Sequence, residues 1–209
     1  MTDKLAWEGT IIAIQPRIRL LRSFDQRSHS YLGYTLGIDG SIGGEPKEFL
    51  VAIGKAAAEK HQFQAGDTVI GESHPVKDNR TEVADLHKTS KLAILTQSET
   101  ELPSPPPWLG VPPSLVIYRE RGHRRLAART YKAQCQSCIW GCHMPVEMII
   151  DQWNPQQKKY RTETFCYGPK SCSFYQAGPT RKVPGRKGMT WEEEDWVDEE
   201  LTAHRSMDE

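Results

Sequence analysis

The nine residues Ser30-Tyr-Leu-Gly-Tyr-Thr-Leu-Gly-Ile38 carry the clearest structural pattern in the chain. Every second residue from Leu32 to Ile38 is apolar, and successive side chains of a β-strand point to opposite faces. The apolar side chains therefore share one face, and Tyr31 lies on the other. This alternation predicts a strand that packs one face on a core and leaves the other toward solvent.

Segments on both sides of this strand extend the pattern. Residues 54–63 are rich in Ala and end before Gly66-Asp67, which predicts a helix. The other expected strands cover residues 7–24, with a bend near Pro16, and residues 48–53, 68–75 and 83–96. We therefore predict that the first half of the chain is mainly β, with five strands and one helix between the third and fourth strands.

This order of elements, over residues 5–97, resembles the OB-fold superfamily, a small five-stranded barrel. The resemblance implies a binding face on the second and third strands and the adjoining loops. Such faces most often bind single-stranded nucleic acid, and sometimes oligosaccharide or protein. Tyr31 and His29 would lie on that face, and Arg17, Arg19 and Arg22 would add phosphate contacts. The alternative is that these are ordinary surface residues.

Proline divides the chain into its expected parts. Prolines crowd the stretch from Leu102 to Pro113, which excludes a helix or the interior of a sheet. A second break follows Gly178-Pro179. The predicted organisation is an OB-like barrel (1–98), a proline-rich linker (99–113), a basic zinc-ribbon-like module (114–178) and a flexible tail that is first basic and then acidic (179–209).

All five cysteines fall between residues 135 and 172. An odd number confined to one region is a poor basis for disulfides, so we expect a reducing compartment and a bound metal. Cys135-Gln-Ser-Cys138 can turn two thiolates toward one ion, and Cys166 with Cys172 would complete a tetrahedral set. Residues 146–153 and 160–165 look like two strands joined by a turn between these pairs.

The order of knuckle, hairpin and knuckle over residues 131–175 resembles a zinc ribbon. The expected zinc ligands are Cys135, Cys138, Cys166 and Cys172, with Cys142 or His143 as a possible substitute. An iron–sulfur cluster remains an alternative, because Cys-x2-Cys-x3-Cys with one distant cysteine also supplies four thiolates.

Charge is strongly segregated along a chain whose formal net charge is zero. Residues 119–187 hold 14 basic and 4 acidic side chains, whereas residues 188–209 hold 1 basic and 9 acidic side chains. A basic block attracts phosphate, and the acidic block could pair with it instead. The expected nucleic-acid-binding residues are Arg121, Arg124, Arg125, Arg129, Lys132, Lys158, Lys159, Arg161 and Tyr31.

These patterns together predict a non-catalytic protein that binds nucleic acid, preferably single-stranded DNA or RNA. We find no nucleotide-binding glycine loop, HExxH motif or nucleophile elbow. Two alternatives stay open: a protein–protein adaptor that presents Trp191 and Trp196 on its acidic tail, and an iron–sulfur redox or sensor protein. No apolar run approaches the roughly 20 residues of a membrane span, so a cytoplasmic protein without a membrane partner is expected.

Overall fold

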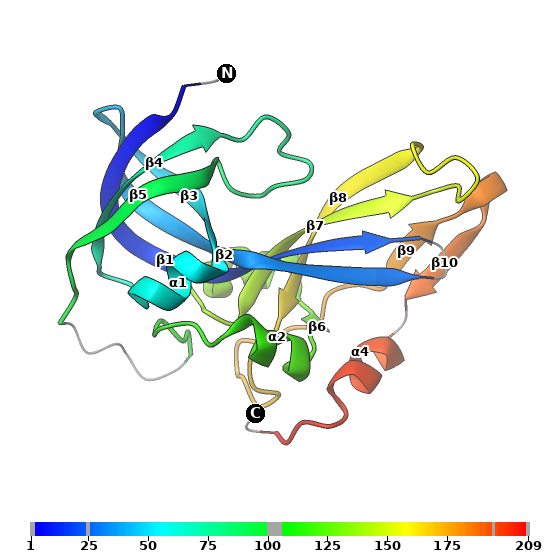
Figure 1. The fold of residues 1–209 in the computed structure, drawn as a ribbon. Coiled ribbons are helices and arrows are strands. Elements are labelled where there is room, and N and C mark those ends of the chain that lie inside the picture. The colour runs from blue at the N-terminus through cyan, green and yellow to red at the C-terminus, as the bar shows by residue number, and fades with distance from the viewer. Residues whose placement is uncertain (1–2, 24–25, 100–105, 194, 208–209) are drawn as a thin grey trace.

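A computed structural model describes residues 3–23, 26–99, 106–193 and 195–207 and shows a mainly β protein (Figure 1). Its strands are β1 (Leu5–Arg22), β2 (Arg27–Ile42), β3 (Glu45–Gly54), β4 (Thr68–Pro75), β5 (Leu86–Thr96), β6 (Arg124–Arg125), β7 (Gly141–Ile149), β8 (Lys158–Cys166), β9 (Arg181–Pro184) and β10 (Thr190–Glu193). Its helices are α1 (Lys55–His61), α2 (Leu115–Arg121), α3 (Ala128–Thr130), the π-helical η1 (Tyr131–Cys135), the 3₁₀-helical η2 (Arg186–Gly188) and α4 (Asp195–Thr202).

The first five strands form a closed ring in the order β1, β2, β3, β5, β4, with β4 pairing back to β1. All neighbours are antiparallel except β3 and β5, which pair in parallel at Val51 and Leu86. Helix α1 lies between β3 and β4, so the predicted mainly β character and the order of elements are confirmed. Irregular register near Ile11 and Arg17 bends the long strand β1, because a bulge increases the local twist.

The ring encloses a core that the alternating pattern anticipated. Leu36 and Ile38 are completely buried, together with Ile11, Ile14 and Val51. Burying such side chains supplies about 1.5–3 kcal/mol each. The opposite face of β2 therefore points to the outside of the ring.

The second half of the chain continues the same sheet. Strand β7 pairs in parallel with the last residues of β1, with Leu20 opposite Val146, and β8 then pairs antiparallel with β7. The eight-stranded order is β2, β3, β5, β4, β1, β7, β8, β6. Strand β1 thus belongs to both the ring and the hairpin, which lie side by side in Figure 1.

The segment expected to be a flexible tail holds β9, β10 and α4 in the structure. Strands β9 and β10 form a two-stranded antiparallel sheet, and Val183 and Val197 are buried. Glu193 and Asp198 form ion pairs with buried arginines of the preceding segments. Opposite charges and apolar side chains therefore attach residues 181–193 and 195–202 to the rest of the molecule.

In the described part of the chain, no helix combines the length and apolar character needed to cross a membrane.

Candidate nucleic-acid interface and cysteine cavity

Four of the five cysteines line one small cavity of about 10 Å³. Cys135 ends η1, Cys138 follows in the next turn, Cys166 ends β8, and Cys172 lies in the loop beyond it. The cavity is closed by aromatic and apolar side chains: Trp108, Trp140, Phe174, Tyr175 and Leu126. The fold thus brings the two predicted cysteine pairs together from segments about 30 residues apart.

Backbone donors are directed at two of these sulfurs. Burial raises the pKa of the Cys138 thiol to about 11, although hydrogen bonds from the backbone N–H groups of Trp140, Trp108 and Gly141 act to lower it. Burial also raises the pKa of Cys166, against hydrogen bonding from the backbone of Gly168. Donors of this kind favour the thiolate, which is the form that binds metal.

Cys142 lies elsewhere. It is completely buried in the main core, where its thiol donates a hydrogen bond of 3.4 Å to the carbonyl oxygen of Pro16. His143, the other possible substitute, is beside Tyr131, with ring centroids 5.5 Å apart. An iron–sulfur cluster held by Cys-x2-Cys-x3-Cys requires Cys142 beside Cys135 and Cys138. In the structure Cys142 does not line their cavity.

The four thiols have the chemistry and the placement of a tetrathiolate metal site, but their sulfurs are not grouped as closely as metal ligands are. Within residues 3–23, 26–99, 106–193 and 195–207, no three His, Cys, Asp or Glu side chains stand in a group ready to hold a metal ion. The four thiols share the wall of a cavity without forming a closed coordination sphere.

One side chain of the ring supports this cysteine segment directly. Gln15 of β1 is buried, and its Nε2 donates to the carbonyl oxygens of Cys135 and Cys138 at 2.8 and 3.0 Å. The hydroxyl of Tyr131 donates to Gln15 Oε1 at 2.6 Å. Each carbonyl also accepts a backbone N–H, from Cys138 at 3.2 Å and from Gly141 at 3.0 Å, so the Gln15 amide adds a second hydrogen bond to both and ties the cysteine turn to the ring.

A groove of about 570 Å³ runs between the outer face of the ring and η1. Its floor includes Ile12, Ala13, Gly37 and Leu50 of strands β1, β2 and β3, and the exposed fractions of Ile12 and Leu50 are 42% and 36%. Ala13 and Gly37 are opposite one another in the pairing of β1 with β2. Because neither has a bulky side chain, the groove is deeper at this point. The wall from the second module carries Lys132, Gln134, Gln136, Ser137 and His143.

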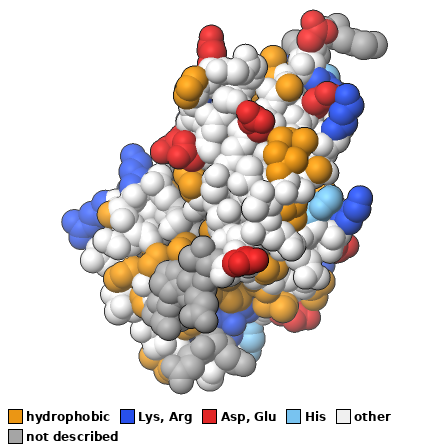
Figure 2. All heavy atoms as spheres, turned by 90° about the vertical axis from the view of Figure 1, so that its left-hand side faces the viewer, with side chains coloured by type: hydrophobic (Ala, Val, Ile, Leu, Met, Phe, Trp, Pro, Cys, Tyr) orange, Lys and Arg blue, Asp and Glu red, His pale blue; other side chains and the backbone are white. Residues whose placement is uncertain are grey.

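The side of the molecule formed by the ring carries patches of exposed hydrophobic side chains (Figure 2). Acidic and basic side chains are interspersed on this face, and neither sign dominates it. A ligand of the ring would therefore meet apolar surface as well as charge.

Most of the predicted nucleic-acid-binding arginines make contacts within the chain. Arg121 Nε donates to the carbonyl oxygen of Tyr167 at 2.8 Å and lies over the ring of Trp140. Arg124 Nη2 donates to the carbonyl oxygen of Pro169 at 2.9 Å, and its guanidinium lies 3.8 Å from the ring centroid of Tyr175. These two arginines hold the loop that follows β8.

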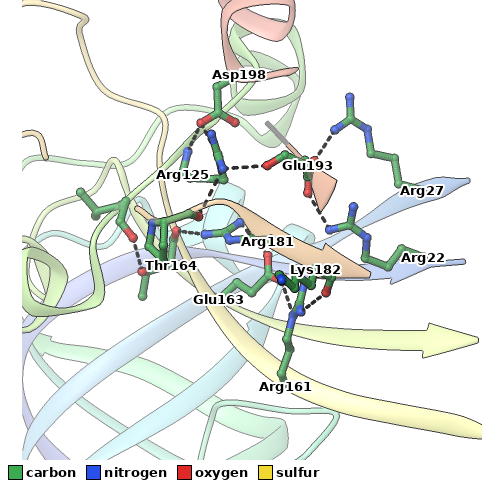
Figure 3. A network of polar contacts seen from close by, with 12 residues as sticks. Arg22, Arg27, Arg125, Arg161, Glu163, Thr164, Arg181, Lys182, Glu193 and Asp198 are labelled. Atoms are coloured by element: carbon green, nitrogen blue, oxygen red, sulfur yellow. Dashed lines mark hydrogen bonds and ion pairs between the residues drawn. The ribbon is translucent and has the colours of Figure 1, made fainter. Parts of the chain in front are cut away.

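Arg125 is a core residue with an exposed fraction of 1%. Its Nε pairs with Asp198 at 3.1 Å, and its Nη1 donates to the carbonyl oxygen of Glu193 at 2.9 Å (Figure 3). Arg161, in the same figure, pairs with Glu163 and donates to the carbonyl oxygen of Lys182. The sequence also allowed the basic block to pair with the acidic block, and Arg125 with Asp198 is such a pair.

The remaining predicted cations lie nearer the surface. Arg129 donates to Gln176 Oε1 at 3.4 Å, and Lys158 pairs with Glu147 at 2.7 Å. Lys132 and Lys159 are exposed, but Lys159 lies on β8 whereas Lys132 lines the groove. The nine predicted residues therefore do not form one continuous platform.

Tyr31 and His29 lie where the ring meets the segment that holds Arg119 and His123. The guanidinium of Arg119 lies 4.9 Å from the ring centroid of Tyr31, and His29 lies 4.9 Å from His123. Burial, followed by the charge of Arg27, lowers the pKa of His29 from 6.5 to about 4. Contacts from Arg119 and His123 thus cover the end of β2 that carries His29 and Tyr31, whereas Thr35 and Gly37 farther along β2 line the groove.

Sequence reasoning did not single out the groove residues Gln134 and Gln136, nor Lys77 and Lys88 near the ends of the β4–β5 connection. The resemblance pointed to loops adjoining the ring, which was a usable signal for the two lysines. The two glutamines carry no such signal, because a polar side chain acquires its role only from the surface that faces it.

No protein-family model matches the chain, and neither a curated protein nor a solved structure matches it.

Proposed function

We propose that the protein binds single-stranded nucleic acid without catalysing a reaction, and that its ring is an OB-type barrel. The strand order β1, β2, β3, β5, β4, the parallel pairing of β3 with β5 and the position of α1 all support this reading. In such barrels the outer face of the second and third strands is the usual ligand surface.

The groove between this face and η1 is the observation that carries the proposal. Its floor of Ile12, Ala13 and Leu50 offers apolar contact to the faces of bases. Lys132 and the amides of Gln134 and Gln136 offer a cation and hydrogen-bonding groups along one wall. A single strand has unpaired bases that can meet such a floor, whereas a duplex buries them.

The proposed mode of binding is tolerant of sequence and sensitive to salt. Apolar contact and amide hydrogen bonds can accept every base, and the lysine contacts phosphate, which releases condensed counterions. Among the described residues that line the groove, Lys132 is the one lysine or arginine, and Glu48 lines it as well, so the salt dependence attributable to Lys132 should correspond to about one phosphate contact.

Fluorescence anisotropy at about 50 mM salt tests the proposal with labelled single-stranded DNA, single-stranded RNA and duplex. We expect tighter binding of a single strand than of the duplex, and a loss of about tenfold in Lys132→Ala/Gln134→Ala. Lys60→Ala, an exposed change on α1 away from the groove, is the matched control. Failure to bind any of the three probes refutes the proposal.

We also propose that Cys135, Cys138, Cys166 and Cys172 hold a structural zinc ion, in a module like a zinc ribbon. The shared cavity and the backbone donors to Cys138 and Cys166 support this choice. A zinc ion with four thiolate ligands has no open position, so it supplies folding stability in place of catalysis.

Elemental analysis of the full chain, with its absorption spectrum, tests the metal. We expect one zinc per chain and a colourless solution, with zinc lost in Cys138→Ser and Cys172→Ser and retained in Cys142→Ser. Retention of zinc in the first two variants would remove the proposed ligand set. A brown protein that contains iron would replace zinc with an iron–sulfur cluster.

A further inference from the structure

A second cavity, of about 610 Å³, lies between the far half of β1 and the connection from β4 to β5. In Figure 1 this connection projects from the ring toward β7 and β8. Arg80 of the connection lies 4.8 Å from the ring centroid of Tyr160 on β8. The residues that line the cavity are Arg17, Arg19, His74, Pro75, Val76, Lys77, Asp78, Thr81, Glu82, His87 and Lys88.

Both acidic side chains of this cavity already have cationic partners. Glu82 accepts hydrogen bonds from Arg17, including one of 2.9 Å from Nε. Asp78 accepts from Arg80 through both carboxylate oxygens, at 2.8 and 2.9 Å. The negative charge of the lining is therefore neutralised within the chain.

Three cations of the lining remain. Among the described residues, Arg19, Lys77 and Lys88 have no acidic partner, and the buried Nε of Arg19 has no hydrogen-bond acceptor. A buried donor without an acceptor costs free energy, so an anion that reached it would be stabilised. Arginine and lysine together, around a single cavity, are suited to the oxygens of a phosphate group.

A histidine, His87, adds a donor to the same wall. His74 and His87 are opposite one another in the pairing of β4 with β5. Neutral imidazole donates one hydrogen bond, and a phosphate oxygen can accept it. The apolar residues Pro75 and Val76 lie beside them, so the cavity also has surface for a part of the ligand other than phosphate.

We propose that this cavity is a phosphate-binding site. Its volume exceeds what one phosphate needs and falls within the range of small-ligand pockets, so the phosphate belongs to a larger molecule. The source is either a free nucleotide or the phosphorylated end of a strand. The second source rests on the proposed function, because it requires a strand bound in the groove to continue along β1 into this cavity. Along β1, Ala13 and Gln15 of the groove are followed at alternate positions by Arg17 and Arg19 of the cavity.

Competition and direct binding with the full chain separate the two sources. The probes are pyrophosphate, a nucleoside 5′-monophosphate, and one labelled oligonucleotide made with either a 5′-phosphate or a 5′-hydroxyl. We expect the phosphorylated oligonucleotide to bind about tenfold more tightly than the hydroxyl form, and pyrophosphate to abolish that difference. Lys77→Ala/Lys88→Ala and Arg19→Gln should each abolish it as well.

The two lysines are exposed, so their replacement should leave the fold intact, which a thermal melt checks. Lys47→Ala, an exposed change on β3, is the matched control and should keep the preference. If strands bind equally with either end and pyrophosphate does not compete, the phosphate site is refuted while the proposed function stands.

If no strand binds but the nucleotide does, and the double variant loses it, the site is supported and the proposed function is refuted. Equal losses in Lys47→Ala and Lys77→Ala/Lys88→Ala would show a general effect of charge and would overturn the site.

Discussion

Replacement of Glu193 by Gln removes the charge on which two arginines depend. The carboxylate accepts from Arg22 Nη1 and from Arg27 Nη1, each at 2.8 Å, and the exposed fractions of the Arg22 and Glu193 side chains are 5% and 8% (Figure 3). Removal of one partner of a buried pair costs about 3–5 kcal/mol, because the other charge stays buried. Since Arg27 is 31% exposed and water can reach it, we expect the lower end, about 3 kcal/mol.

In a chain of this size, about 1 kcal/mol lowers the melting temperature by about 2–4 °C, so Glu193→Gln should melt about 6–12 °C below the unaltered protein. Scanning calorimetry and urea titration measure the change. Glu192→Gln is the control, because Glu192 is the preceding residue of β10 and pairs with Lys182 at an exposed site. We expect about 0.5 kcal/mol there. Equal melting temperatures for the two variants would refute the reasoning.

Three further predictions follow from the same structure. Gln15→Ala should lower the free energy of unfolding by about 1–3 kcal/mol in urea titration, because it removes one of the two hydrogen bonds of each buried carbonyl and takes away the acceptor of the Tyr131 hydroxyl; a change as small as that of Gln136→Ala at the surface would contradict this role. The folded state holds the pKa of His29 at about 4, below the usual 6.5, so stability should fall as the pH drops from about 6.5 to 4, by about 3 kcal/mol in total; if the pH profile is unchanged in His29→Gln, another group is responsible. Deletion of residues 190–209 should uncover Arg22 and Arg125 and lower the melting temperature, and a truncated chain that melts like the full one would show that these pairs contribute little.

Local pattern predicted most of the strands. The alternation from Leu32 to Ile38 located β2, and the Ala-rich run located α1, because these signals depend only on side-chain spacing and propensity. The strands predicted at residues 146–153 and 160–165 correspond to β7 (Gly141–Ile149) and β8 (Lys158–Cys166), although β7 begins five residues and ends four residues earlier than predicted. Boundaries differ by a few residues, since pairing partners extend strands beyond their apolar centres.

Long-range pairing could not be predicted in the same way. The contact between β1 and β7 involves three residue pairs that are about 126 residues apart in sequence, and nothing local marks them. The partner of a charge is equally a tertiary property. Arg124 and Arg125 are neighbours in the sequence, yet one holds a surface loop and the other is buried with Asp198.

The cysteine segment shows both outcomes. Spacing suggested two pairs, and the structure brings all four of these thiols to one cavity. Spacing alone could not separate Cys142 from the others, because its distance from Cys138 also suits a metal ligand. Only its burial against Pro16 places it in the core.

The sharing of β1 between the ring and the hairpin has a consequence for any attempt to study the halves separately. A fragment that ended after residue 98 would leave Leu20, Leu21 and Arg22 as an open edge with unsatisfied backbone donors and acceptors. Open edges recruit strands from other molecules, and Ile18 and Leu20 beside this one are apolar. Such a fragment would tend to self-associate, so the ring should be assayed only as part of the intact chain.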